Sequence, residues 1–153
     1  MKKLACFIAT LGPIGTNLPA PGTWGSLFAL ITGYFLLSHS WIMLTFATII
    51  ALVAGLWSAG IYEAVTNKKD ASEVIIDEVA GQWSVLLVAP LTIEGFIAAF
   101  LLFRFFDITK PFPVNKAEKI PGAIGVMVDD IVAGGLAGIG ILALLLSGWL
   151  PLS

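Results

Sequence analysis

Long apolar stretches separated by short charged segments dominate the hydrophobic pattern of this chain. Residues 42–62 contain no charged side chain and predict a membrane-spanning helix that ends at Glu63. Four further apolar helices are predicted, over residues 24–38, about 72–89, 93–106 and 125–150. The helix at 24–38 would be only about 20 Å long, so it either crosses the bilayer or turns back within it.

The first segment of the chain, residues 4–22, is apolar but interrupted by several glycines and prolines. This pattern is typical of an irregular segment or a short interfacial helix. Thr23 follows Pro21 and Gly22 and precedes an uninterrupted apolar run. Its position favours an N-cap for the next helix, although a phosphate-binding role for its hydroxyl stays open.

The composition agrees with a membrane protein. Hydrophobic residues make up 58% of the 153 residues and charged residues only 12%, whereas soluble domains carry about 25% charged residues. We expect an all-α, polytopic membrane helical bundle with about five membrane-associated helices, forming one domain over residues 1–153. The net charge of −2 argues against nucleic acid as a partner, one cysteine excludes an internal disulfide, and no obligate protein partner is evident.

The charged residues sort to one side of this five-helix arrangement. All eight lysines and arginines fall on the side of the N-terminus, which predicts a cytoplasmic N-terminus and an external C-terminus. Nine of the ten acidic residues lie on the same side, and Glu94 is the exception. Carboxylates near a membrane are costly unless they are paired or bind metal, so this cluster predicts a functional site that faces the cytoplasm.

Several acidic and basic residues are candidates for phosphate chemistry. Carboxylate oxygens suit Mg²⁺, whereas zinc or copper sites use histidine and cysteine, of which the chain has one each. Basic side chains and the free amides at a helix start, here near residues 21–26, bind phosphate oxygens. The candidate acids are Asp77, Glu78, Asp107, Asp129 and Asp130, and the nearest basic residues are Arg104, Lys110 and Lys116.

Together these groups predict phosphoryl chemistry on a membrane lipid. Cys6 lacks the nearby arginine of a cysteine phosphatase, and the single His39 excludes a two-histidine mechanism. Metal-activated water and a carboxylate nucleophile both remain open. An ion or divalent-metal transporter and a non-catalytic assembly subunit are the alternatives from other functional classes, but a transporter would need polar groups at mid-membrane on several helices.

Four motifs occur in order along most of the chain: PGTWGSL (21–27), IIDEVAGQW (75–83), RFFDITKPFPVNKAE (104–118) and GVMVDDIVAG (125–134). Together they resemble the phosphatidylglycerophosphatase A family. The resemblance implies a Mg²⁺-dependent phosphatase of the bacterial inner membrane that converts phosphatidylglycerophosphate to phosphatidylglycerol. This chain departs from the family pattern only in loop positions, at Ala71, Ala123 and Val126.

The resemblance also implies roles for individual residues. It makes Asp77, Glu78, Asp107, Asp129 and Asp130 the metal-binding and catalytic acids. We further hypothesise that Asp77, Glu78 and either Asp129 or Asp130 bind Mg²⁺, and that Asp107 aligns a water molecule or Lys110. The phosphate would be bound by Arg104, Lys110 and Thr23. Simpler interpretations stand beside these. Asp107 is spaced to pair with Arg104 or Lys110 on a helix, and Lys116, Glu118 and Lys119 are expected to face lipid headgroups.

Overall fold

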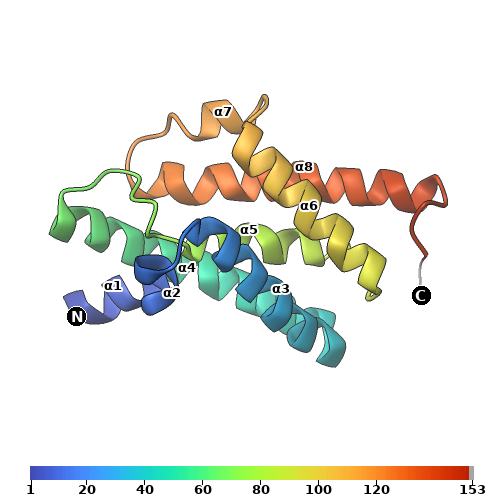
Figure 1. Cartoon of the computed structure of the whole chain (residues 1–153), viewed down its shortest axis with the longest axis horizontal. Coiled ribbons are helices and arrows are strands. Elements are labelled where there is room, and N and C mark those ends of the chain that lie inside the picture. The colour runs from blue at the N-terminus through green and yellow to red at the C-terminus, as the bar shows by residue number, and fades with distance from the viewer. Residues whose placement is uncertain (152–153) are drawn as a thin grey trace.

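A computed structural model describes residues 1–151 and contains helices but no strand within that range (Figure 1). The predicted all-α class is therefore confirmed for the described part of the chain. In chain order the helices are α1 (Lys2–Thr10), α2 (Pro13–Asn17), α3 (Pro21–His39), α4 (Trp41–Thr66), α5 (Ile76–Leu86), α6 (Ile93–Thr109), α7 (Val114–Ala117) and α8 (Ala123–Leu146).

The five longest helices, α3, α4, α5, α6 and α8, correspond to the five that the hydrophobic pattern predicts. They run alternately toward one end of the molecule and the other, and the two termini lie at opposite ends (Figure 1). The short α5 has 11 residues and a length of about 16 Å, which is too short to span a bilayer. It lies among the longer helices, and most of its residues are buried.

Tertiary contacts move several helix boundaries away from their predicted positions. We expected α5 to begin near Ser72, but it begins at Ile76 because the preceding segment contacts α1: the amide of Ile75 donates to the Ala9 carbonyl at 2.8 Å. The α4 helix continues past Glu63 to Thr66 and is capped by Asn67, which adopts a left-handed conformation. The N-terminal segment forms two short helices, α1 and α2, rather than an irregular chain.

The predicted N-cap at Thr23 is wrong. The α3 helix begins earlier, at Pro21, with Ala20 as the N-cap residue. Proline is favoured at the first helical position because its φ angle already suits a helix and its missing N–H group is not needed there. Thr23 is therefore the third residue of α3, and within residues 1–151 its hydroxyl makes no hydrogen bond that could replace a cap.

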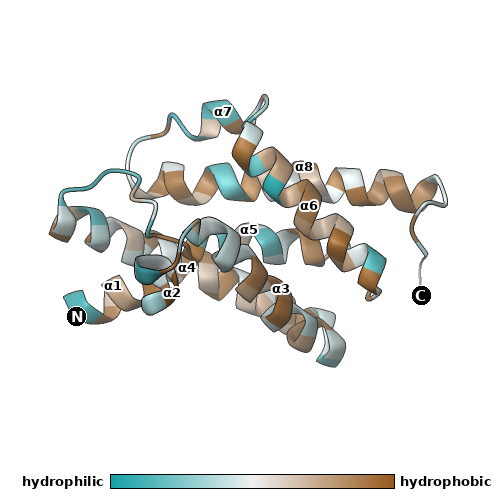
Figure 2. Ribbon diagram, viewed as in Figure 1, coloured by the Kyte–Doolittle hydropathy of each residue, from teal (hydrophilic) through white to brown (hydrophobic). Residues whose placement is uncertain are grey.

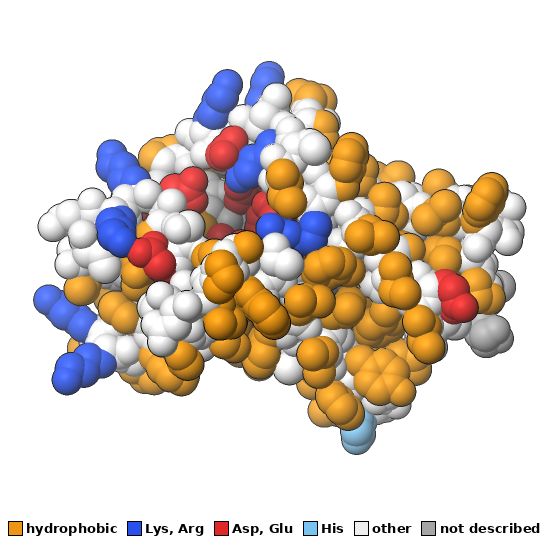
Figure 3. Space-filling view, viewed as in Figure 1, with side chains coloured by type: hydrophobic (Ala, Val, Ile, Leu, Met, Phe, Trp, Pro, Cys, Tyr) orange, Lys and Arg blue, Asp and Glu red, His pale blue; other side chains and the backbone are white. Residues whose placement is uncertain are grey.

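Two helices, α4 and α8, are long and apolar enough to cross a bilayer. Only 33% and 39% of their most apolar stretches are buried, so most of this apolar surface faces outward. Brown, apolar residues dominate α8 in Figure 2, and Figure 3 shows hydrophobic side chains over most of one half of the visible face. Lys, Arg, Asp and Glu side chains gather mainly in the other half. This surface is compatible with membrane association.

Close packing of α5 against α8 brings the acidic residues of the two helices together. A methyl group added at Gly134 of α8 would lie 2.7 Å from the Gly81 carbonyl oxygen of α5. One added at Gly81 would lie 2.9 Å from the Asp130 carbonyl oxygen. Small residues at such crossings let two helix backbones approach each other closely. Gly138, one turn later on α8, faces Val88 just beyond the end of α5, and a methyl group added there would lie 3.2 Å from the Val88 side chain.

We predict that Gly134→Ala destabilises the protein by about 1–3 kcal/mol, because the added methyl group must push α5 and α8 apart. The matched control is Gly135→Ala, whose added methyl group meets nothing within 4 Å. It should leave stability unchanged or raise it slightly, since alanine favours helix more than glycine does. Thermal unfolding in detergent, followed by circular dichroism, measures both. Equal melting temperatures for the two variants would contradict this account of the helix crossing.

Candidate active site

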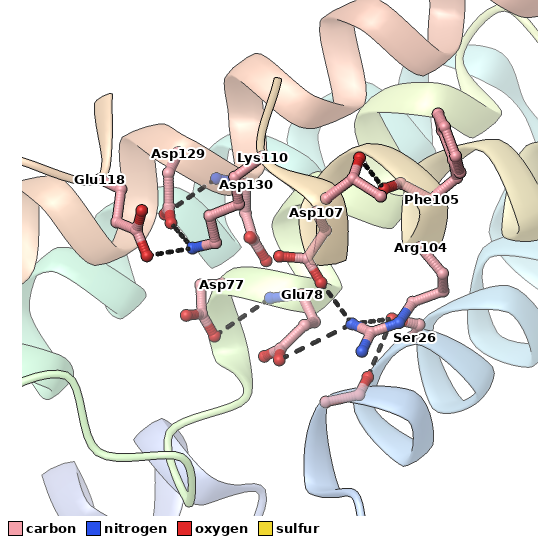
Figure 4. Close-up of polar contacts among 12 residues, drawn as sticks. Ser26, Asp77, Glu78, Arg104, Phe105, Asp107, Lys110, Glu118, Asp129 and Asp130 are labelled. Atoms are coloured by element: carbon pink, nitrogen blue, oxygen red, sulfur yellow. Dashed lines mark hydrogen bonds and ion pairs between the residues drawn. The ribbon is translucent and has the colours of Figure 1, made fainter. Parts of the chain in front are cut away.

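Three carboxylates from two helices form the centre of the candidate site. Asp77 and Glu78 lie in the first turn of α5, and Asp130 lies in the second turn of α8. One oxygen from each of the three lies within 4.8 Å of the other two. The amide of Glu78 donates to Asp77 Oδ1 at 3.1 Å, which orients the Asp77 side chain beside the helix start (Figure 4). The N-terminal end of a helix favours negative charge, so α5 supports two of the three acids.

A lysine and two further acids border this cluster. Lys110 follows the last residue of α6 and has a left-handed backbone conformation. Its Nζ atom donates to Asp129 Oδ2 at 2.5 Å and lies 3.2 Å from Glu118 Oε1 (Figure 4). Burial alone would lower the pKa of Lys110, but the hydrogen bonds and charges of Asp129 and Glu118 outweigh burial and raise this pKa. Lys110 therefore carries a full positive charge at neutral pH.

Arg104, in the last two turns of α6, lies on the opposite side of the cluster. Its Nη1 atom donates to Asp107 Oδ2 at 2.6 Å and lies 4.0 Å from Glu78 Oε1 (Figure 4). The predicted pairing of Arg104 with Asp107 is thus present. The Nε atom of Arg104 is buried and has no hydrogen-bond partner within residues 1–151. The guanidinium group consequently has a buried donor that no other described residue uses.

The start of α3 closes the site next to Arg104. Ser26 Oγ lies 3.5 Å from Arg104 Nη1 and donates to the Gly22 carbonyl oxygen. Gly22 leaves space that the site needs, because an added methyl group would collide with Glu78 Oε1 and lie 3.2 Å from Arg104 Nη1. Four segments that are far apart in sequence, at α3, α5, the end of α6 and α8, therefore meet here.

The buried acids are costly to keep charged without a cation. Asp77 and Asp130 are 8% and 4% exposed, and Glu78 Oε2 and Asp130 Oδ2 have no hydrogen-bond partner within residues 1–151. Burial raises the pKa of Glu78 to about 8. Buried carboxylates of this kind are normally stabilised by metal or by opposite charge.

These observations test whether a hard divalent cation fits the site. Each of Asp77, Glu78 and Asp130 offers an oxygen close enough to the others for one cation to contact all three. Two of the three side chains have an oxygen without a partner. An all-oxygen donor set suits Mg²⁺ or Ca²⁺ rather than zinc or copper. The residues present therefore fit such an ion.

The structure brings together nearly all the residues that the sequence singled out. The five candidate acids, Arg104 and Lys110 lie in one network (Figure 4). Asp129 lies outside the three-carboxylate group and pairs with Lys110 instead. The metal, catalytic and phosphate-binding roles of these residues stay predictions, including the phosphate role of Thr23.

Sequence reasoning missed three residues near the site. Glu118 was expected to face headgroups, yet it is an ion-pair partner of Lys110. Ser26 belongs to the first motif and was not singled out, although it contacts Arg104. Gln82 of the second motif is fully buried one turn after Glu78, and its amide has no partner within residues 1–151. Their position inside the motifs was the only available signal for Ser26 and Gln82.

Comparisons with known proteins place the chain in a family. The family model described as phosphatidylglycerophosphatase A matches residues 7–145. A phosphatidylglycerophosphatase A of Haemophilus influenzae is 39% identical over 118 residues, covering 75% of this chain and 72% of the relative. The Escherichia coli protein of the same name is 30% identical over 122 residues, covering 78% and 71%.

A third relative carries a different name. A Bacteroides thetaiotaomicron protein, provisionally named a phosphatidylinositol-3-phosphatase, is 43% identical over 123 residues, covering 75% of this chain and 77% of the relative. No solved structure matches the chain significantly. The family model spans most of the chain, and two relatives at 30% identity or more carry the family's name. The chain therefore belongs to the phosphatidylglycerophosphatase A family and is a phosphatase enzyme.

Proposed function

We propose that this protein removes the terminal phosphate of phosphatidylglycerophosphate in a Mg²⁺-dependent reaction, giving phosphatidylglycerol and phosphate. One observation carries the proposal: the oxygens of Asp77, Glu78 and Asp130 converge within 4.8 Å, with a lysine and an arginine on either side. Family membership supplies the reaction class. The transporter alternative has no support, because all three named relatives are phosphatases.

Asp77, Glu78 and Asp130 are the residues that would hold the cation. A divalent ion bound there neutralises phosphate charge and lowers the pKa of a nearby water. Asp129 positions the Lys110 ammonium group, which donates hydrogen bonds to the phosphate. Arg104, oriented by Asp107, presents its guanidinium group to another phosphate oxygen from the opposite side of the cluster. These fixed positive groups stabilise the negative charge that spreads over the phosphoryl oxygens during transfer.

We propose further that the protein is a multi-pass protein of the bacterial inner membrane. In this arrangement α4 and α8 cross the bilayer, and α3 and α6 enter it and enclose α5. The charged end, with the N-terminus, faces the cytoplasm, because lysines and arginines are retained on that side. The alternating directions of the five longest helices and the apolar exterior support this placement of the helices in the bilayer (Figures 1 and 3).

A second substrate is worth testing for the same site. The relative at 43% identity is named for activity on a phosphatidylinositol 3-phosphate, which is also a phosphomonoester on a phospholipid. Purified protein should be given each lipid in mixed micelles with and without Mg²⁺, and phosphate release measured. We expect faster release from phosphatidylglycerophosphate. Preference for the inositol lipid would overturn the substrate assignment but not the site.

We predict that Asp130→Asn and Asp77→Asn each lower the phosphatase rate by more than about 100-fold, since even outer partners of metal ligands contribute about 10- to 100-fold. Without Mg²⁺ neither variant should melt at a lower temperature than the wild type, because each removes a buried charge from a crowded site. Glu94→Gln, at the other end of α6, is the control and should retain activity. Full activity in both aspartate variants would contradict the site assignment.

We predict that Arg104→Lys lowers kcat/KM at least about tenfold, although it keeps the positive charge. Lysine lacks the planar fork that binds two oxygens at once and the Nε–H group that is free here. The matched control is Lys68→Arg, an exchange in the exposed ion pair with Glu73, which should be neutral. Wild-type kinetics for Arg104→Lys would show that the residue only balances the charge of Asp107 and Glu78.

We predict that the protein binds Mg²⁺ more tightly as the pH rises from about 6 to about 8. The Glu78 carboxyl has a pKa of about 8 and must lose its proton before it can bind a cation, so affinity should rise about tenfold per pH unit for each proton released. Because this pKa is raised on folding, the metal-free protein should also become less stable over the same range. Activity titrated with Mg²⁺ at several pH values measures the affinity, and a pH-independent midpoint would contradict the prediction.

A further inference from the structure

An apolar groove lies between the middle of α3 and the start of α6, on the two helices that also border the candidate site. Its volume is about 380 Å³. Its walls include Leu30, Ile31 and Tyr34 of α3 and Ile93, Phe96 and Ile97 of α6. No charged side chain lines it.

The same two helices border the groove and the candidate site. At the site, Ser26 of α3 lies 3.5 Å from Arg104 of α6. Leu30, the first groove residue on α3, follows Ser26 by about one helical turn. On α6, Ile97 precedes Arg104 by seven residues, or about 10 Å of helix, which is less than the thickness of about 15 Å that one lipid leaflet contributes to the hydrocarbon core.

We propose that this groove binds an acyl chain of the phospholipid substrate during hydrolysis. The inference rests on the proposed function, because it takes the substrate to be a phospholipid whose headgroup occupies the carboxylate site. The headgroup and the acyl chains of such a lipid are covalently joined, so the chains must leave the site through an apolar opening. The start of α3 and the end of α6 form that opening.

The distance from the candidate site to the far end of the groove suits one lipid leaflet. Eleven residues separate Arg104 from Ile93 along α6, which corresponds to about 16 Å of helix. The hydrocarbon core of a bilayer is about 30 Å thick, so one leaflet contributes about 15 Å. An acyl chain that starts near Arg104 can therefore reach the far end of the groove within its own leaflet.

The base of the groove is packed and its rim is open. Phe96 is only 8% exposed and packs edge-to-face against Tyr34, with ring centres 5.9 Å apart. Ile97, on the α6 wall, is 53% exposed and can be enlarged without disturbing this contact. A tryptophan at position 97 would fill the groove and displace the chain.

A second apolar groove, on α4, provides a matched control. It has a volume of about 390 Å³ and is lined by Ile49, Ile50, Val53, Ala54 and Trp57. It is therefore similar in size and chemistry, but none of its residues belongs to the segments that border the carboxylate site. Val53 is 63% exposed, so Val53→Trp adds the same bulk to a lipid-facing surface away from the site.

The experiment compares wild type, Ile97→Trp and Val53→Trp with full-length protein in detergent and Mg²⁺. Each is assayed for phosphate release from phosphatidylglycerophosphate with palmitoyl chains and from the same lipid with butanoyl chains. We expect Ile97→Trp to raise KM for the palmitoyl lipid by about tenfold, equivalent to ~1.4 kcal/mol, and to leave the butanoyl lipid unaffected. Val53→Trp should change neither. Ile31→Trp, on the α3 wall, repeats the test if Ile97→Trp does not fold.

The possible outcomes separate the proposals. Equal KM changes for both lipids, or none for either, would overturn the groove assignment while the phosphatase function stands. A change in oligomeric state on size-exclusion chromatography, confined to the groove variants, would show that the groove binds a second copy of this chain and would also overturn it. If the wild type releases no phosphate from either lipid, the proposed function fails and the groove assignment fails with it.

Discussion

Mutual repulsion among buried carboxylates is the constraint around which this structure is arranged. Asp77, Glu78 and Asp130 lie in a region nearly closed to water, where like charges are expensive and a cation or a proton must compensate them. The α5 helix can approach α8 closely enough to create this cluster because Gly81 and Gly134 lie where the two helices cross. The close crossing of α5 and α8 therefore brings the three carboxylates near enough for one cation to contact them all. The same crossing also causes the repulsion among their negative charges.

Positive charge reaches the cluster from a single segment, the end of α6 and the residue that follows it. Arg104 and Lys110 lie on opposite sides of the three carboxylates, and each is held by an acid of its own, Asp107 and Asp129. These pairs keep the two cations in place without using all their donors. Several buried polar atoms still lack partners within residues 1–151. The candidate site thus keeps polar groups that a bound ligand could pair with, a pattern typical of catalytic centres that give up stability for function.

The surface explains how such a polar site can act on a lipid. Apolar side chains cover much of the outside of the helices, while charged side chains collect toward one end (Figure 3). The site lies where these two kinds of surface meet, next to the start of α3 and the end of α6. A phospholipid has the same division between a charged headgroup and apolar chains. One molecule can therefore contact the carboxylate cluster and an apolar helix surface at once.

The sequence alone determined the helical class, the five principal helices and the acidic and basic residues of the site, because long apolar runs and rare charges are local features of the chain. Tertiary structure decided the rest. Because the segment before α5 contacts α1, α5 begins later in the chain than the sequence predicts. Lys110 forms ion pairs with Asp129 and Glu118, so Asp129 lies outside the group of three clustered carboxylates. The start of α5 and the ion pairs of Lys110 depend on distances between segments that are remote in sequence, and no local pattern of residues encodes those distances.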